Sequence, residues 1–273
     1  MNYRHAFHAG NFADCMKHAL LVSLLGHFLR KPSPFMVLDT HAGLGRYDLT
    51  SEEAEKTQEW KEGIGLLAEE GPDSPLAPWL ELVKKSGGPH YYPGSPLLTA
   101  LMLRPQDELI CCEKHPEDKR KLYGMFTRTP NVFVHERDGY EALRALLPPK
   151  TAKRGLVLID PPFEEPGEFD RLFQAVQTIH TRFPTGMIAL WYPIKHRTPV
   201  RAFHTALEDA EISNVLVAEL LMRKPVDPDR LNGAGLVVIK PPYGFAEQAT
   251  AQLNRLKTLL HAEDAVVKQL TAE

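Results

Sequence analysis

The stretch VLIDPPFEE, residues 157–165, places a carboxylate, two prolines and an aromatic ring directly after an apolar run. Pro161 and Pro162 lack backbone N–H donors and have a fixed φ, so we expect a strand to end at Asp160 and to continue into a stiff turn. The Asp160 carboxylate and the Pro161 carbonyl would then form a rigid pair of hydrogen-bond acceptors. Phe163 would add a surface on which a planar base can stack.

Acidic residues also follow three other apolar runs: Asp39, Glu113 and Asp138. In doubly wound sheets, ligands bind beyond the carboxyl ends of the strands, where an acid often accepts hydrogen bonds from a ribose. Asp39 leads into a glycine turn at Gly43 that is neither a P-loop nor a GxGxxG fingerprint, and Asp138 could simply cap a helix. The series of four acidic strand ends is more specific than any one of them, and it favours a cofactor that carries a sugar and a base.

The elements that would position these residues alternate between strand and helix. Seven short apolar runs predict strands at 35–39, 109–113, 132–135, 156–160, 187–191, 214–220 and 235–240. Segments with helical spacing lie between or after them at 95–103, 117–125, 139–147, 167–181, 200–210 and 244–261. Mostly continuous apolar runs are typical of strands buried on both faces. This order predicts an α/β domain with a seven-stranded, mostly parallel, Rossmann-like sheet.

Two segments depart from this alternation. A helix at about 12–30 precedes the first strand. Residues 50–92 separate the first strand from the next core helix, and they begin with an acidic run that is most simply a solvated helix face. We expect residues 1–273 to form a single domain, with 50–92 as a small helical insertion subdomain attached to one edge of the sheet.

Composition limits the classes of function. The chain has 273 residues, 43% of them hydrophobic, and a net charge of −3, so it lacks the overall basic field of a general nucleic-acid binder. The apolar segment 19–29 is too short to span a bilayer, and Arg30, Lys31 and Pro32 follow it rather than a cleavage site. We expect a cytoplasmic protein whose three cysteines are reduced and structural.

The residues Asp160 to Phe163 resemble the D/N-P-P-Y/F/W motif of amino methyltransferases that act on adenine N6 or related exocyclic nitrogens. Four stretches resemble a single family, the RlmJ-type adenine-N6 methyltransferases of large-subunit ribosomal RNA: YRHAFHAGNFADCMKH at 3–18, LDTHAGLGRY at 38–47, YYPGSPLL at 91–98 and LVLIDPPF at 156–163. The resemblance runs nearly end to end, including the insertion.

This resemblance implies a class I methyltransferase fold with S-adenosylmethionine as methyl donor and S-adenosylhomocysteine as product. The implied target is N6 of one adenine in 23S ribosomal RNA, adenine 2030, methylated before the subunit is fully assembled, and the product is N6-methyladenine. The base would have to leave its stack to reach the pocket.

The resemblance also implies roles for individual residues. Asp160, Pro161 and Phe163 would be catalytic, with Asp160 as a candidate acceptor of the proton lost after transfer. Tyr3 and Arg4 would meet the RNA. The cofactor-binding positions would be Lys17, His18, His41, Gly43, Ser95, Glu113, Asp138, Gly139 and Asp160. Among these, Glu113 would take the ribose and Asp138 the adenine amine. His41 would contact the methionine part, with Lys17 and His18 near its carboxylate. An ordinary exposed lysine is the alternative for Lys17, and Asn11 could be a helix cap.

Basic and aromatic residues follow the fifth predicted strand in the stretch WYPIKHR, 191–197. Trp191 and Tyr192 beside Lys195 and Arg197 are suited to single-stranded nucleic acid next to the target pocket. A second strand-Pro-Pro-aromatic stretch, VVIKPPYG at 237–243, has Lys240 in place of the acid. Because a lysine ammonium only donates, we place this stretch at the end of the last strand, away from the target base.

Two alternatives remain open. One is a metal-dependent hydrolase, nuclease or other DNA-processing protein built from histidines and acids, without an HExxH motif: His5, His8, Asp14, His18, Asp39 and His41. The other is a non-catalytic RNA-binding protein that retains a methyltransferase fold, although such a protein would be expected to have lost Asp160. We assign no metal ligands, and the absence of a heptad pattern favours a monomer.

Overall fold

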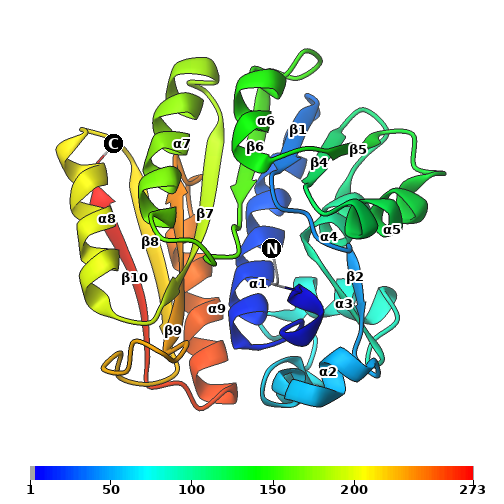
Figure 1. Cartoon of the computed structure of the whole chain (residues 1–273), viewed down its shortest axis with the longest axis vertical. Coiled ribbons are helices and arrows are strands. Elements are labelled where there is room, and N and C mark those ends of the chain that lie inside the picture. The colour runs from blue at the N-terminus through cyan, green and yellow to red at the C-terminus, as the bar shows by residue number, and fades with distance from the viewer. Residues whose placement is uncertain (1–3, 273) are drawn as a thin grey trace.

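The computed structural model describes residues 4–272. Within them, one eight-stranded sheet in the order β10-β8-β9-β7-β6-β1-β4-β5 forms the centre of the molecule, with helices on both faces (Figure 1). Its strands are β1 (Phe35–Asp39), β4 (Glu108–Glu113), β5 (Val132–Glu136), β6 (Arg154–Ile159), β7 (Met187–Ile194), β8 (Val215–Leu221), β9 (Gly233–Ile239) and β10 (Asp264–Thr271).

The sheet is parallel from β5 to β7 and mixed beyond. Strand β9 runs antiparallel to β7 and β8, and β10 runs antiparallel to β8. The predicted α/β fold is confirmed, but the prediction of seven strands is wrong because β10 is an eighth. Strand β10 lies at the sheet edge and is only partly buried, so residues 264–271 need no continuous apolar run. Backbone pairing with β8 and the packing of Ala265 and Val267 against the core hold it in place.

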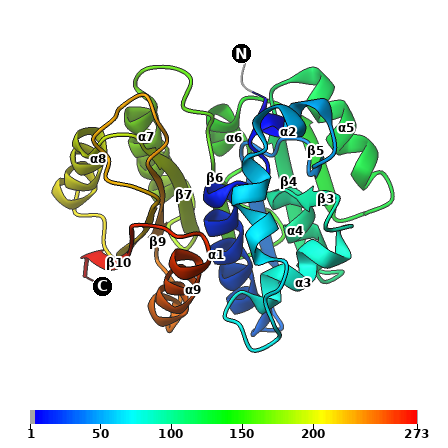
Figure 2. The ribbon, with the colours of Figure 1, turned by 90° about the horizontal axis from the view of Figure 1, so that it is seen from below.

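Helices cover the sheet in two layers (Figure 2). On one face lie α1 (Phe12–Leu29), α4 (Ser95–Met102), α5 (Pro116–Phe126) and α9 (Phe245–Leu259). On the other face lie α6 (Gly139–Leu146), α7 (Glu168–Arg182) and α8 (Arg197–Asp209). The inner parallel strands β1 and β6 therefore bury both faces, which explains their continuous apolar runs, whereas the edge strand β5 is only partly buried.

Helix α1 is a core helix. Asn11 caps it by accepting hydrogen bonds from the N–H groups of Ala13 and Asp14. The helix is long and apolar enough to cross a membrane by length and composition, with a mean hydropathy of 1.2, but 72% of it is buried inside the protein. A helix packed on nearly all sides shows no amphipathic stripe, because almost every face contacts protein.

Residues 50–92 contain α2 (Glu52–Thr57), two short 3-10 turns (Glu59–Glu62 and Ile64–Leu67) and α3 (Ala77–Lys85). The strands β2 (Arg46–Asp48) and β3 (Tyr91–Pro93) pair at the base of this segment. Trp79 is fully buried in the same core as α1, and Glu70 pairs with Arg255 of α9. The segment thus packs on the layer formed by α1 and α9, whereas the sequence analysis expects it to attach to one edge of the sheet. We propose that it folds as part of one domain with the rest.

The parallel strands β1, β4, β5 and β6 bring their carboxyl ends to one edge of the sheet. Asp39 lies beside Leu158 of β6 and Cys111 of β4 in register, so Asp160 emerges next to the end of β1. Lys240 lies at the opposite edge, as predicted, because β9 is antiparallel and Ile239 pairs with Ile188 at the start of β7. It does not end the last strand, since β10 follows.

Candidate active site

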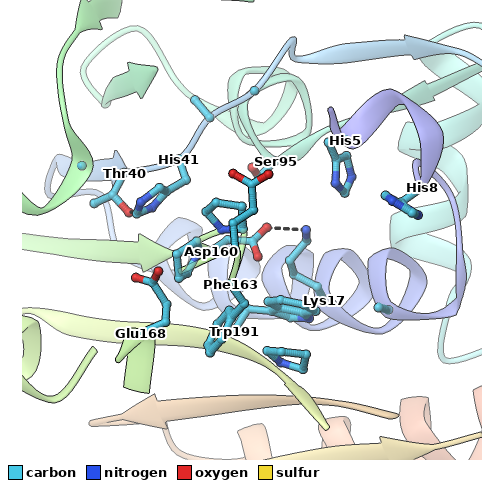
Figure 3. Close-up of a pocket in the computed structure, with 18 of the residues that line it drawn as sticks. His5, His8, Lys17, Thr40, His41, Ser95, Asp160, Phe163, Glu168 and Trp191 are labelled. Carbon is cyan, nitrogen blue, oxygen red and sulfur yellow. Dashed lines mark hydrogen bonds and ion pairs between the residues drawn. The ribbon is translucent and has the colours of Figure 1, made fainter. Parts of the chain in front are cut away.

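A pocket of about 1470 Å³ opens at the carboxyl ends of the parallel strands (Figure 3). Its walls include the DPPF turn after β6, the glycine turn after β1, the start of α6 and the inner face of α1. All of the predicted catalytic and cofactor-binding residues line this one pocket: Lys17, His18, His41, Gly43, Ser95, Glu113, Asp138, Gly139, Asp160, Pro161 and Phe163.

The DPPF turn is held rigidly. Phe163 has a φ of 51°, in the left-handed region that a bulky residue rarely adopts and that costs about 1–3 kcal/mol. Its ring makes edge-to-face contacts with Phe169 at 5.1 Å and with Trp191 at 6.0 Å between ring centroids. These contacts hold the strained backbone and place an aromatic wall of the pocket beside Asp160 (Figure 3).

Lys17 extends from α1 to Asp160, the acidic residue of the DPPF turn. Its Nζ donates to Oδ2 of Asp160 at 2.5 Å and to Oδ1 of Asp14 at 2.9 Å, and its side chain is only 5% exposed. Burial by itself would lower the pKa of Lys17, but the two carboxylates raise it well above its usual value. Lys17 is therefore a buried, charged residue of the site rather than an ordinary surface lysine.

Asp39 has a carboxylate oxygen without a partner. The side chain is fully buried, Ser95 Oγ donates to its Oδ2 at 2.7 Å, and its Oδ1 has no hydrogen-bond partner among the described residues. Burial, reinforced by the nearby charge of Asp160, raises the pKa of Asp39 to about 7. A buried acceptor that stays unpaired is costly. Asp39 does not itself line the pocket, but its partner Ser95 and the adjoining Thr40 and His41 do.

Glu113 secures the glycine turn. Its Oε2 accepts from the N–H of Gly43 at 2.8 Å and its Oε1 accepts from the N–H of His115 at 2.8 Å. Gly43 has a φ of 63°, and a Cβ there would lie 2.3 Å from the hydroxyl of Tyr47. Burial raises the pKa of Glu113. Each of its carboxylate oxygens keeps a second lone pair with which it could accept from a ligand hydroxyl.

Asp138 has two roles in the structure. Its Oδ1 caps α6 by accepting from the N–H groups of Tyr140 and Glu141 at 3.0 and 3.3 Å, so the capping interpretation is confirmed. Its Oδ2 accepts from Lys114 Nζ at 3.1 Å, and the residue also lines the pocket. Although burial works against ionisation, these hydrogen bonds and the charge of Lys114 lower the pKa of Asp138.

Gly139 allows α6 to begin against the end of β1. A Cβ at this position would lie 2.3 Å from the carbonyl oxygen of Thr40, a backbone atom that cannot move without disturbing the strand end. We expect Gly139→Ala to lower the free energy of unfolding by about 1–3 kcal/mol through this overpacking, measured by urea denaturation. Gly124→Ala is the matched control, because Gly124 lies in α5 with nothing within 4 Å of its Cβ. That control should instead gain about 1 kcal/mol from helix propensity. Equal effects of the two substitutions would contradict the packing argument.

Two histidines of the pocket are neutral near pH 7. His18 Nδ1 lies 2.8 Å from the Tyr92 hydroxyl, and burial lowers the pKa of His18 to about 3. His41 Nδ1 lies 2.8 Å from Thr40 Oγ1, its ring meets Tyr140 edge to face, and burial lowers its pKa to about 4. These residues add polar groups to the pocket without adding positive charge.

The metal-site alternative has no supporting cluster in the described residues. Across residues 4–272, no three His, Cys, Asp or Glu side chains gather in a way that could hold a metal ion. Instead, His5 Nε2 lies 2.8 Å from Asp14 Oδ2, and His8 Nδ1 lies 2.9 Å from Glu59 Oε1.

The residues expected to bind RNA do not all reach the pocket. Lys195 is exposed and lines it, whereas Arg197 NH1 donates to Oε2 of buried Glu219 at 2.5 Å. Tyr192 is fully buried and donates to the same glutamate, so it cannot present its ring beside Trp191 as expected. Neighbouring residues of a strand point to opposite faces, and β7 extends through this stretch to Ile194.

The N-terminal expectations are only partly within the structure. Arg4 is exposed and pairs with Glu117 at 3.4 Å, while Tyr3 lies outside the described residues. Sequence reasoning missed Asp14 as a partner of Lys17, although their i, i+3 spacing on a helix was the available signal. It also assigned no individual role to Asp39, whose unpaired carboxylate oxygen only the structure reveals.

Comparisons with known proteins agree with this geometry. The family model described as "Ribosomal RNA large subunit methyltransferase D, RlmJ" matches residues 32–269. The chain is 41% identical to "Ribosomal RNA large subunit methyltransferase J" of Haemophilus influenzae, covering 95% of this chain and 94% of the relative. It is 38% identical to the protein of the same description from Escherichia coli, covering 96% and 94%. Protein LPL1258 of Legionella pneumophila, a crystal structure, matches with a TM-score of 0.87 and 32% identity over 96% of this chain and 98% of its own.

Proposed function

The chain belongs to the RlmJ family of ribosomal RNA large subunit methyltransferases, and from this premise we propose that it methylates N6 of one adenine in 23S ribosomal RNA with S-adenosylmethionine. The observation that carries the choice of an exocyclic amine is the Asp160 carboxylate beside Pro161 and Phe163, in a pocket where Lys17 occupies only one carboxylate oxygen. By its resemblance to the family, adenine 2030 is the proposed target.

The pocket fits S-adenosylmethionine. Ser95, His41 and Gly43 line the pocket and are suited to the methionine part of the cofactor. Asp39 lies behind them, hydrogen-bonded to Ser95, and its unpaired Oδ1 is the proposed partner of the cofactor's ammonium group. Glu113 has lone pairs for the ribose hydroxyls, and Asp138 for the adenine amine. His18, Gly139 and Lys17 complete the proposed set. When bound, S-adenosylmethionine supplies an electrophilic methyl group on a positively charged sulfur.

The residues of the DPPF turn would handle the target base. The lone pair of adenine N6 is delocalised into the ring, so the amine is a poor nucleophile. Asp160 Oδ1 and the Pro161 carbonyl would accept hydrogen bonds from the two amino hydrogens and favour a pyramidal nitrogen. Phe163 would stack on the base for about 1–3 kcal/mol. Asp160 is also in place to take the proton that N6 loses after transfer.

The pH dependence of cofactor affinity tests the role of Asp39. The pKa of its carboxyl in the free protein is about 7, and only the ionised form can pair with an ammonium group. We expect the dissociation constant for S-adenosylmethionine to rise about tenfold per pH unit below about pH 6, measured by titration calorimetry. Because the folded-state pKa of Asp39 is above its unfolded value, the contribution of Asp39 to the stability of the free protein should rise as pH falls from about 7 towards 4, while the lowered pKa values of His18 and His41 act in the opposite direction.

Asp39→Asn is the control for this titration. The amide cannot ionise, so the variant should bind weakly and with little pH dependence. A wild-type affinity that is constant between about pH 5 and 8 would exclude Asp39 as the ammonium partner.

Lys195 and Arg197 provide a matched test of the RNA edge. Lys195→Ala should weaken RNA binding and reduce the slope of log affinity against log salt by about 1, with an unchanged melting temperature. Arg197→Ala should instead destabilise the fold by about 3–5 kcal/mol, because it leaves Glu219 buried without its ion pair. Filter binding at several salt concentrations and thermal unfolding separate the two effects. If both variants fold and lose RNA affinity equally, Arg197 contacts RNA directly and its role is not limited to pairing with Glu219.

We further propose a cytoplasmic, monomeric protein that acts before the large subunit is fully assembled. The burial of α1 supports a role for this helix in the core rather than in a membrane. The pocket lies at the carboxyl ends of the parallel strands and is lined by residues of one chain, which supports a site that is complete in a monomer.

The direct experiment is transfer of labelled methyl groups from S-adenosylmethionine to protein-free 23S ribosomal RNA from cells that lack this protein, with DNA in parallel. Label on one adenine of the RNA would support the proposal. Label on DNA alone would mean that the substrate is DNA and not ribosomal RNA. Cofactor binding without label on either polymer would favour an RNA-binding protein.

A further inference from the structure

Asp14 is a buried carboxylate for which the proposed chemistry gives no role. Its side chain is only 2% exposed, although it lies on α1 at the edge of the pocket. Its Oδ1 accepts from Lys17 Nζ at 2.9 Å. Its Oδ2 accepts from the N–H of Gly10 at 2.9 Å and lies 2.8 Å from His5 Nε2. Both oxygens are therefore engaged, one towards the DPPF acid and the other towards the segment that precedes α1.

We propose that Asp14 is a positioning residue for methyl transfer, acting on Asp160 through Lys17 and on residues 5–11 through His5 and Gly10. This inference rests on the proposed function, because it concerns the same site. It adds a link between two parts of the pocket that are far apart in sequence: the acid that would hold the target base and the N-terminal segment.

The first argument is geometric. The Lys17 ammonium lies between Asp14 Oδ1 and Asp160 Oδ2, and it is 5.8 Å from the ring centroid of Trp191. Held from both sides, it engages a single oxygen of Asp160 and orients that carboxylate. The other oxygen stays available for the amino group of the base. Without Asp14, the flexible lysine chain could turn its ammonium towards both oxygens of Asp160 and compete with the base.

The second argument is electrostatic. Burial alone would raise the pKa of Asp14, yet the charges of His5 and Lys17 hold it well below its usual value, so Asp14 is ionised. The ionised Asp14 therefore holds the Lys17 ammonium by charge as well as by hydrogen bonding, and the attraction is strong because both side chains are buried. Asp14 thus fixes the ammonium that contacts Asp160.

The third argument concerns the N-terminal segment. Gly10 has a φ of 77°, and its N–H donates to the same oxygen of Asp14 that lies beside His5. The turn into α1 and the ring of His5 are thus tied to the carboxylate that holds Lys17. Figure 3 shows His5 above the pocket and Lys17 reaching Asp160 from α1. A change in the position of Asp14 would therefore move both the N-terminal segment and Lys17.

The test compares Asp14→Asn with Asp107→Asn. Asp107 is a fully buried, ion-paired acid before β4, at the opposite edge of the sheet, so its loss should lower stability without changing the pocket. Under saturating cofactor and RNA, we expect single-turnover methyl transfer by Asp14→Asn to be about 100-fold slower than wild type. The affinity for RNA, measured without cofactor, should stay within about threefold. Asp107→Asn should transfer at the wild-type rate.

A second readout needs neither cofactor nor RNA. Amide hydrogen exchange in the free protein should become faster in peptides covering residues 5–11 of Asp14→Asn, because the N–H of Gly10 loses its carboxylate acceptor. The same peptides of Asp107→Asn should exchange as in wild type. Unchanged exchange in Asp14→Asn would overturn the link to the N-terminal segment.

A folded Asp14→Asn that transfers methyl at the wild-type rate would overturn the link to Asp160. If Asp14→Asn does not fold, Asp14→Glu keeps the charge and displaces the carboxylate. That variant should transfer about tenfold more slowly with a near wild-type melting temperature, and a wild-type rate would reject the proposal. Failure of the proposed function has a different signature, because wild type itself would then transfer no methyl to RNA.

Discussion

Asp160→Ala should slow methyl transfer to RNA by about 1000-fold, the effect of removing a preorganised group that acts on the reacting atoms. The alanine cannot accept a hydrogen bond from N6, and it removes the group that would take the proton. Lys17 keeps Asp14 as a partner, so the variant should fold. Rapid-quench measurement with labelled S-adenosylmethionine gives the rate, and thermal unfolding gives the stability.

Two further variants sharpen this result. Asp160→Asn keeps the shape but replaces one acceptor with a donor, so it should be nearly as slow as the alanine variant. Glu164→Gln changes an exposed acid in the same turn and should transfer at the wild-type rate. If Asp160→Ala retained more than about a tenth of the wild-type rate, Asp160 could not be the acceptor for the amino group.

Lys17→Met should cost about 3–5 kcal/mol of folding free energy at neutral pH, because it leaves Asp14 and Asp160 facing each other without their shared cation. The folded-state pKa of Lys17 is raised. Its stabilising contribution is therefore fully present below the unfolded pKa of about 10.4 and is lost only as pH rises through the folded value. The charge of Lys17 is intact throughout the neutral range.

The loss in Lys17→Met should shrink in acid, where protonation relieves the repulsion between the two carboxylates. Urea denaturation at several pH values measures this difference, and single-turnover assays should show methyl transfer slowed by about 100-fold. Lys114→Met is the control, since Lys114 pairs with Asp138 at the surface and should contribute at most about 1 kcal/mol. Similar stability losses for the two lysines would contradict the burial of Lys17 that the structure shows, because a desolvated pair should cost more to break than an exposed one.

The parallel part of the fold was legible in the sequence. Continuous apolar runs predicted β1 at its observed bounds and the other core strands within a few residues, because both faces of these strands are buried. Pro161 and Pro162 marked the end of β6, since two residues without N–H donors cannot extend a ladder. The edge strand β10 was missed because an edge strand is held by backbone pairing, which leaves little side-chain pattern.

Local chemistry also identified most of the pocket. Acids at four strand ends converge because parallel strands end at one edge of the sheet, and Asp39, Glu113, Asp138 and Asp160 all lie there. The prediction was weaker where two faces of a strand had to be distinguished. Tyr192 follows Trp191 in a strand that is apolar on both sides, and its neighbours do not reveal which ring is buried against Glu219.

The amino-acid sequence by itself determined the α/β class, the stiff acidic turn at residues 160–163 and the family to which the chain belongs, because these depend on short-range patterns and on motifs. Only the tertiary structure decided which charges meet. Lys17 and Asp160 are 143 residues apart, and Arg197 is held by Glu219 on another strand. Whether a charged side chain is a buried partner or a free surface group depends on packing between distant segments, which no local pattern encodes.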